Sequence, residues 1–173
     1  MRSTIGVLLA VLITPLAQAE LIDDINDRGE LRIAVQPDNA PYSYKDQQSE
    51  RLTGFEIEFG QDLARELGLR ADFVEASAAQ VLPGVESGTY DVSLTSSSES
   101  PKADGPFDVS RAFGEKKLVI QFQKDNPAFQ SAVNNALERL EKNGRTEELE
   151  KKWFKAMQAG EPAPAALVPA PAH

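Results

Sequence analysis

Short β-rich runs alternate along this chain with stretches whose apolar residues recur at helical spacing. The first run, residues 31–35, contains strand-favouring residues and stops before Pro37. Strands that alternate with helices predict an α/β fold: a mainly parallel sheet with helices on both faces, in three layers. Ligands of such sheets lie at the carboxyl ends of the strands. The predicted strands are residues 31–35, 69–75, 90–95 and 118–122.

The first helical pattern follows Gly54. Its core-facing residues recur every four positions, which predicts one buried face. A shorter helix is expected around residues 81–85, ending at Gly88. The first pattern has Phe55, Phe59, Leu63 and Leu67 on its core side, Asp62, Arg65 and Glu66 on its solvent side, and Gly68 as its stop.

Two further helices are predicted near the C-terminus. Asn126 and Pro127 are typical of a helix start, and Gly144 ends that helix. Thr146 is expected to cap the last helix, with Trp153 and Phe154 in the core. The core face of the longer helix is Phe129, Val133, Leu137 and Leu140, and Leu149 continues it on the last one. Acidic residues expected on the solvated surface are Glu138, Glu141, Glu147, Glu148 and Glu150.

The two ends of the chain differ from its middle. A positive start, an apolar run over residues 5–13 and Ala17-Gln18-Ala19 form the pattern of a secretory signal peptide, residues 1–19, cleaved before Glu20. Residues 159–173 are rich in Pro and Ala, which predicts a disordered tail. Residues 20–158 then make one domain. We expect a periplasmic protein that does not span the membrane after cleavage.

The composition excludes several kinds of chemistry. The chain has no Cys, and its one His is His173, so thiolate chemistry, a serine–histidine triad and a histidine-based metal site are all ruled out. We expect no metal, no cofactor and no catalytic residue. A net charge of −9 argues against nucleic-acid binding, which needs a basic surface.

Four segments occur in the order typical of one family. Residues 29–44, 52–69, 82–103 and 126–154 resemble the first lobe and the closing helices of family 3 solute-binding proteins, the periplasmic amino-acid receptors of ABC importers. The resemblance implies one lobe of the type II periplasmic binding protein fold. Family members have two lobes, with the ligand held between them.

The second lobe of that family is not recognisable here. The family's chain would leave the first lobe at residues 107–110, yet a segment resembling the return strand and final helices begins at Glu115. Residues 118–122 resemble both the return strand and the strand that enters the second lobe. We therefore expect a single lobe.

The ligand-contacting positions of the family can be carried over by resemblance. The usual acidic residue falls at Gln36, and two aromatic positions fall at Asn39 and Ala78. The arginine that grips the substrate carboxylate falls at Ala103, beside Lys102. Donors are retained at Ser96 and Ser98. Because the charge pair and the aromatic clamp are replaced, the resemblance implies weak or altered binding of a small polar solute.

Several of these positions also have a structural interpretation. Tyr42 and Tyr44 could stack on a ligand or pack against the helix that begins at Phe55. The serines at residues 96–98 could bind a solute or form a flexible polar loop. The polar residues 36–39 are equally compatible with a turn.

Three functions remain open from the sequence. The first is a reduced solute-binding protein that serves a membrane permease or a sensor. The second is a periplasmic protein–protein module, because residues 37–43 also resemble a motif in accessories of quinoprotein dehydrogenases. A homodimer could use the face left by the missing lobe. The third is a fold that has lost its ligand. An enzyme is not expected.

Overall fold

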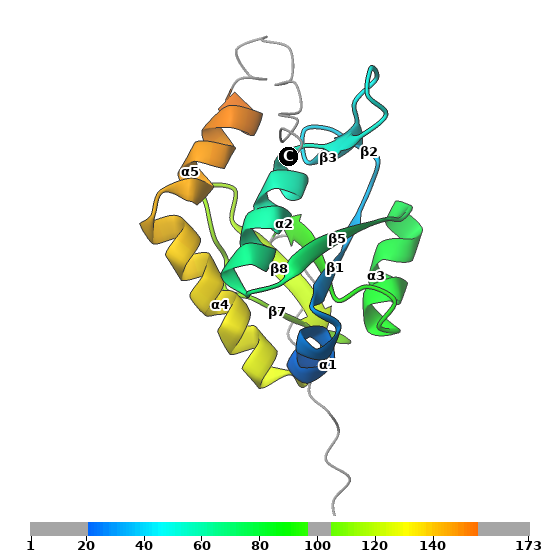
Figure 1. Cartoon of the computed structure of the whole chain (residues 1–173), viewed down its shortest axis with the longest axis vertical. Coiled ribbons are helices and arrows are strands. Elements are labelled where there is room, and N and C mark those ends of the chain that lie inside the picture. Colours follow the sequence, from blue (N-terminus) through cyan, green and yellow to red (C-terminus); the bar gives the residue numbers. More distant parts are fainter. Residues whose placement is uncertain (1–20, 97–104, 156–173) are drawn as a thin grey trace, which may run out of the picture.

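The structure is a computed structural model, and it describes residues 21–96 and 105–155. A five-stranded sheet lies at its centre in the order β5 (Arg70–Glu75), β1 (Glu30–Val35), β6 (Val92–Ser96), β8 (Leu118–Gln123), β7 (Phe107–Val109) (Figure 1). The pairs β1–β5 and β1–β6 are parallel, whereas β8 runs antiparallel to both of its neighbours. The four predicted strands are confirmed, and so is the mainly parallel sheet.

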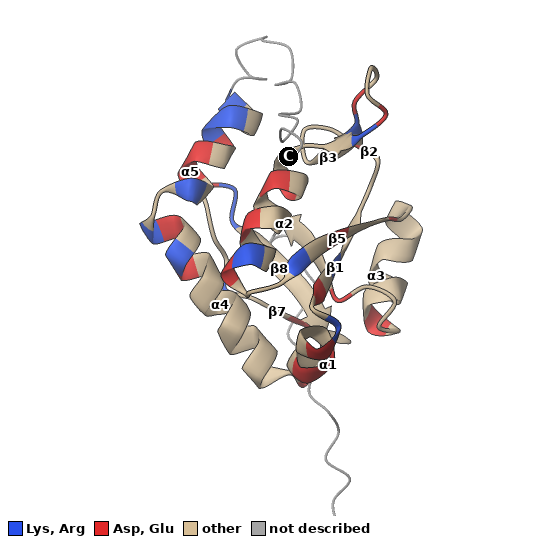
Figure 2. Cartoon of the chain, in the orientation of Figure 1, with Lys and Arg blue, Asp and Glu red and all other residues tan. Residues whose placement is uncertain are grey.

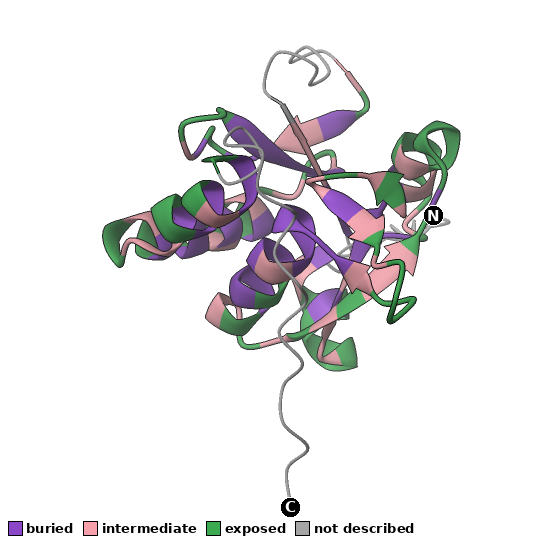
Figure 3. Ribbon diagram, turned by 90° about the horizontal axis from the view of Figure 1, so that it is seen from above, coloured by how far each residue is buried: buried purple, intermediate pink, exposed green. Residues whose placement is uncertain are grey.

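Helices cover both faces of the sheet. One face carries α1 (Leu21–Arg28), α2 (Phe55–Glu66), α4 (Pro127–Lys142), α5 (Arg145–Glu150) and a π-helical turn (Lys151–Lys155), which share the larger hydrophobic core. The other face carries α3 (Ala78–Glu86), whose Val85 packs with Ala34 and Tyr90 in a smaller core. The three predicted layers are therefore present (Figures 1 and 3). Successive residues of β1 serve opposite cores, since Ile33 faces the larger one and Ala34 the smaller.

The core-facing residues of helix α2 recur as predicted, but one residue predicted to face solvent is buried. Phe55, Phe59 and Leu63 are buried, and the rings of Phe55 and Phe59 stack with centroids 5.4 Å apart. The prediction for Asp62 was wrong: it is buried, because the bend between α4 and α5 brings the Nε of Arg145 within 2.6 Å of its carboxylate. A single-helix pattern contains no information about an arginine that lies far along the chain.

The C-terminal helices match the sequence prediction in most respects. Asn126 stands at the N-cap position of α4, although its side chain makes no capping bond, Pro127 is the first residue of the helix, and Trp153 and Phe154 are buried. The four residues predicted for the core face of α4 are all buried: Phe129, Val133, Leu137 and Leu140.

Two predictions in this region were wrong. Thr146 does not cap α5, because Gly144 adopts a left-handed conformation (φ 81°) and lets the helix begin at Arg145. Glu150 is buried rather than solvated, because its carboxylate accepts hydrogen bonds from the backbone amides of Glu115 (3.1 Å) and Lys116 (3.2 Å). This carboxylate therefore holds the bend that leads into β8.

A second, three-stranded antiparallel sheet covers the N-terminus of α2. It consists of β2 (Asp38–Asn39), β3 (Ser43–Lys45) and β4 (Leu52–Thr53) (Figure 1). The backbone carbonyls of Pro41 and Tyr42 accept hydrogen bonds from the first amides of α2, those of Phe55 (3.0 Å) and Glu56 (2.8 Å). These bonds satisfy helix donors that no side chain caps.

Strand β8 belongs to the sheet of this lobe. It lies between β6 and β7, and β7 reaches it through residues 110–117 alone. Residues 118–122 thus form a strand of the same sheet as β1, β5 and β6, and their correspondence to the family's return strand or to its entry strand stays a prediction. The predicted signal peptide (residues 1–19) and tail (residues 159–173) lie outside the described residues. Within the described residues, no helix is long and apolar enough to cross a membrane.

Candidate functional site

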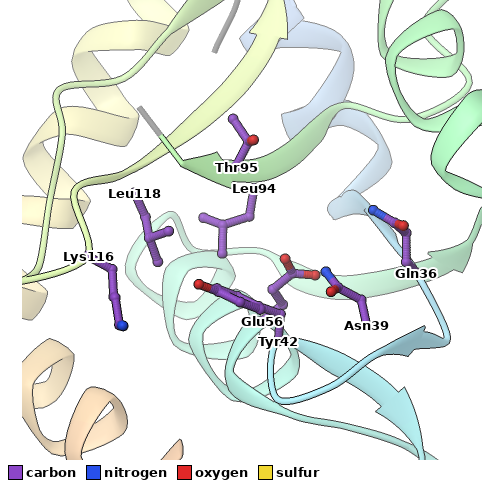
Figure 4. Close-up of a pocket in the computed structure, with 8 residues that line it drawn as sticks. All are labelled: Gln36, Asn39, Tyr42, Glu56, Leu94, Thr95, Lys116 and Leu118. Atoms are coloured by element: carbon purple, nitrogen blue, oxygen red, sulfur yellow. The ribbon is translucent and has the colours of Figure 1, made fainter. Parts of the chain in front are cut away.

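A cavity of about 450 Å³ opens at the carboxyl ends of β1 and β6. Gln36 follows β1, Thr95 lies near the end of β6, and Leu118 begins the antiparallel strand β8 at the same edge. The small sheet and the N-terminus of α2 close another side. The full lining is Gln36, Asn39, Tyr42, Glu56, Leu94, Thr95, Lys116 and Leu118 (Figure 4). We call this cavity the edge pocket.

Three of the predicted site residues meet in the edge pocket: Gln36, Asn39 and Tyr42. The backbone amide of Tyr42 donates to the carbonyl of Asn39 (2.8 Å), which places both side chains on one tight turn. The ring of Tyr42 also packs against Phe154, with centroids 5.1 Å apart. The packing interpretation of Tyr42 is therefore confirmed, and the residue also lines the pocket, whereas its stacking on a ligand stays a prediction.

Tyr44 has only a packing role among the described residues. Its ring meets Trp153 edge-on at 6.3 Å, and it does not line the edge pocket.

The other predicted positions lie elsewhere. Ala78 is the exposed first residue of α3 and does not line the edge pocket. The backbone of Ser96 ends β6, but its side chain is outside the described residues, and so are Ser98, Lys102 and Ala103. Their roles stay predictions.

Glu56 is the main feature that the sequence did not predict. It lies in the first turn of α2, only 9% exposed, and its Oε2 accepts a hydrogen bond from the hydroxyl of Ser43 (2.8 Å). Burial raises the pKa of Glu56 to about 7, and the hydrogen bond from Ser43 opposes that rise. Glu56 lies next to Phe55 and outside the set of core residues that recur every four positions. The helical pattern alone therefore does not indicate that Glu56 lines a cavity.

Lys116 supplies a positive charge to the same pocket. Its amide is held by Glu150, and its ammonium lies 5.3 Å from the ring centroid of Phe154, within range of a cation–π contact. The edge pocket thus combines an apolar base, Leu94 and Leu118, with amides, hydroxyls and two ionisable groups of opposite sign. Such a lining suits a small polar solute. The described residues contain no group of three or more acidic or histidine side chains that could hold a metal ion.

The sequence profile of the bacterial extracellular solute-binding proteins, family 3, matches residues 31–156, which is most of the chain. The chain belongs to this family. The recognition made from its motifs is therefore confirmed, and the match includes both the edge pocket and the closing helices.

Two relatives of the chain are L-cystine-binding proteins. The chain is 27% identical over 115 residues to the L-cystine-binding protein TcyA of Bacillus subtilis, covering 66% of this chain and 42% of TcyA. It is 26% identical over 130 residues to the L-cystine-binding protein TcyJ of Escherichia coli, covering 72% of this chain and 48% of TcyJ. The chain thus spans less than half the length of these relatives.

Solved structures confirm the fold. The ancestral cationic amino acid solute-binding protein AncCDT-1 superposes with a TM-score of 0.66 at 18% identity, over 77% of this chain and 99% of that one. The arginine-bound form of domain 1 from TmArgBP, as its Phe57Trp mutant, superposes with a TM-score of 0.63 at 20% identity, over 70% of this chain and 98% of that one. At these identities the similarity concerns architecture alone.

Proposed function

We propose that this family 3 chain binds a small polar solute of the amino-acid class in the edge pocket, as a single lobe, outside the cytoplasm. The observation that carries the proposal is the position of the pocket. It lies where a sheet of this kind presents its ligands, and it gathers Gln36, Asn39 and Tyr42 from the turn after β1.

A lone lobe is sufficient for such binding in principle. Domain 1 of TmArgBP, a single domain with the same architecture, was solved in an arginine-bound form. Here residues 110–117 join β7 directly to β8, at the point where the family's chain would leave for a second lobe. We infer that this chain works without one, and that its open pocket binds more weakly than a closed cleft, since water screens contacts made on one side only.

The proposed partner is a membrane permease that accepts the solute, as expected for receptors of ABC importers. We propose no enzymatic role, because the relatives that the chain matches are binding proteins. The sequence resemblance to dehydrogenase accessories concerns residues 37–43, and three of the pocket-lining residues lie in or beside that segment. A role in solute binding therefore accounts for this turn as well as a role in protein assembly does.

Thermal unfolding with L-cystine, L-arginine and L-histidine tests this proposal. Binding to the native state raises the unfolding midpoint, so at least one of these amino acids should raise it in a concentration-dependent manner. Gln36→Ala should weaken that binding by about 3- to 10-fold, the effect of one lost neutral hydrogen bond. The matched control is Gln48→Ala, an exposed glutamine outside the pocket.

Two results would count against the proposal. One is an unchanged midpoint with every amino acid at millimolar concentration. The other is an equal loss of binding in both glutamine variants. If a second protein, and no amino acid, raised the unfolding midpoint, the protein–protein module would be favoured.

A further inference from the structure

The edge pocket is lined by one acidic and one basic side chain. Neither stands at a position where the family resemblance places a charge that contacts the ligand. Glu56 belongs to the first turn of α2, and Lys116 to the bend before β8. In Figure 4 the carboxyl group of Glu56 lies beside Asn39 and Tyr42, whereas Lys116 lies across the pocket beside Leu118. The positions expected to carry these charges are Gln36 and Ala103, which are neutral.

Glu56 differs both from Asp62 and Asp91, which have cationic partners, and from Glu150, whose carboxylate accepts hydrogen bonds from two backbone amides. Asp62 is paired with Arg65 and Arg145, and Asp91 is paired with Arg28 and Arg32. None of the ion pairs among the described residues includes Glu56, whose side chain is bonded to the Ser43 hydroxyl. A buried carboxylate without a cation carries a large desolvation cost, which a cation in the adjoining cavity would offset.

Lys116 also lacks an acidic partner among the ion pairs of the described residues. The neighbouring Glu115 pairs with Lys155, and Glu150 is bonded to backbone amides rather than to the Lys116 ammonium. The Lys116 ammonium lies over the ring of Phe154, and the residue lines the pocket. A carboxylate in the pocket would be its natural counter-ion.

We propose that Glu56 receives the ammonium group of a zwitterionic solute and that Lys116 receives its carboxylate. The solute class is then a free α-amino acid. This assignment rests on the proposed function and names the groups that determine its specificity. The protein would then still recognise both charges of a zwitterion, but with side chains at positions other than those implied by the family resemblance.

Binding should then depend on pH. An ammonium binds the ionised carboxyl group, so the apparent affinity falls as Glu56 takes up a proton below its pKa of about 7. Other charged or titratable groups on the elements around this carboxyl are Asp38, Tyr42, Tyr44, Lys45, Glu58 and Lys116. Lys45 is paired with Glu75, and neither Lys45 nor Tyr44 lines the pocket.

Calorimetry with L-arginine and L-cystine at pH 8.0 and 5.5 tests the assignment. We expect the affinity at pH 5.5 to be about 30-fold lower, from protonation of one group with a pKa near 7. Glu56→Gln should remove this pH dependence and lower the affinity at pH 8.0 at least tenfold. N-acetyl-L-arginine, which lacks the α-ammonium, should bind without a pH dependence.

Matched controls separate the two charges. Glu58→Gln changes a carboxylate on the same helix that pairs with Lys152 outside the pocket, and it should bind like the unaltered protein. Lys116→Gln should weaken binding about tenfold while keeping the pH dependence, and the neighbouring Lys117→Gln should do neither. Gln can still accept the Ser43 hydrogen bond, so Glu56→Gln is expected to fold, which far-UV circular dichroism checks.

The outcomes are distinct. Binding that is equal at both pH values and unchanged in Glu56→Gln overturns this assignment and leaves the proposed function standing. No binding of either amino acid at either pH overturns both.

Discussion

At the scale of single residues, the buried carboxylates Asp91 and Glu56 are satisfied in different ways. Asp91 has a fully buried side chain and is satisfied by Arg28, by Arg32 and by the backbone amide of Arg32. Glu56 is almost as buried and has a serine hydroxyl instead of a cation. The first arrangement fixes the start of β1 to the start of β6 at the edge opposite the pocket. The second keeps a costly group at the pocket, which is typical of a functional site.

The cost of Glu56 predicts a pH-dependent stability. Its pKa of about 7 in the folded protein exceeds its ordinary value of 4.5, so the native state binds more protons between these pH values. Stability therefore falls as pH rises through this window, and the shift corresponds to about 3 kcal/mol by pH 8. Glu56→Gln should be more stable than the unaltered protein by about 2–3 kcal/mol at pH 8 and nearly equal at pH 4.5.

Urea unfolding at the two pH values measures this difference. Glu58→Gln, which changes a half-buried carboxylate of the same helix that is paired with Lys152, serves as the control and should show no such gain. A Glu56→Gln variant that is equally destabilised at both pH values would mean that the carboxyl group is needed for packing rather than for a ligand.

At the scale of elements, the pocket depends on how closely two backbones approach. Gly54 precedes α2 with a φ of 128°, and a Cβ there would lie 2.3 Å from the carbonyl oxygen of Tyr42. No side chain fits in that space without separating the turn of residues 39–42 from the helix. This contact places Glu56 and Tyr42 on the same pocket.

Gly54→Ala should therefore be severely destabilising, by about 3 kcal/mol or more, since backbone atoms must move. Gly68→Ala is the matched control at the other end of α2, where φ is also positive but nothing lies within 4 Å of the added carbon. It should cost only about 1 kcal/mol. Chemical unfolding of both variants checks the difference, and similar losses in the two would show that the approach to Tyr42 is not the reason.

The length of each element decides whether it could be predicted from the sequence. Strands β1, β5, β6 and β8 and helices α2, α3 and α4 have clear periodicity and were predicted. The strands of the small sheet and β7 have two or three residues each, too few for a period to be visible. Gln36, Asn39 and Tyr42 could be placed because they directly follow β1. Glu56 and Lys116 could not, because their positions depend on Ser43, Phe154 and Glu150, which are distant in sequence.

At the scale of the whole molecule, the described residues share one large hydrophobic core. Its largest buried side chain, Trp153, is contributed by the last described turn, and Phe154 seals it against Tyr42 and Phe55. Both termini of the described lobe are thus tied into the larger core, since Leu21 and Ile25 of α1 join it as well. Charges of both signs are spread over the helices around this core (Figure 2).

This arrangement predicts that the lobe is stable without the Pro/Ala-rich segment. A chain ending at Gln158 should have nearly the same melting temperature as the full chain, because a large core already forms within the described residues, from Leu21 to Phe154, and a Pro/Ala-rich segment has little apolar bulk to add. Differential scanning calorimetry of the two proteins makes the comparison. A fall of several degrees in the shortened protein would show that residues 159–173 contribute to the folded lobe.

The central claim is that a single lobe binds an amino acid in the edge pocket. Its most direct test is a titration of isotope-labelled protein with L-arginine and L-cystine at pH 8, followed residue by residue by nuclear magnetic resonance. The account predicts concentration-dependent, saturable shifts that centre on Gln36, Asn39, Tyr42, Glu56 and Lys116. Shifts centred on another part of the lobe, or none at millimolar concentration of either amino acid, would contradict it.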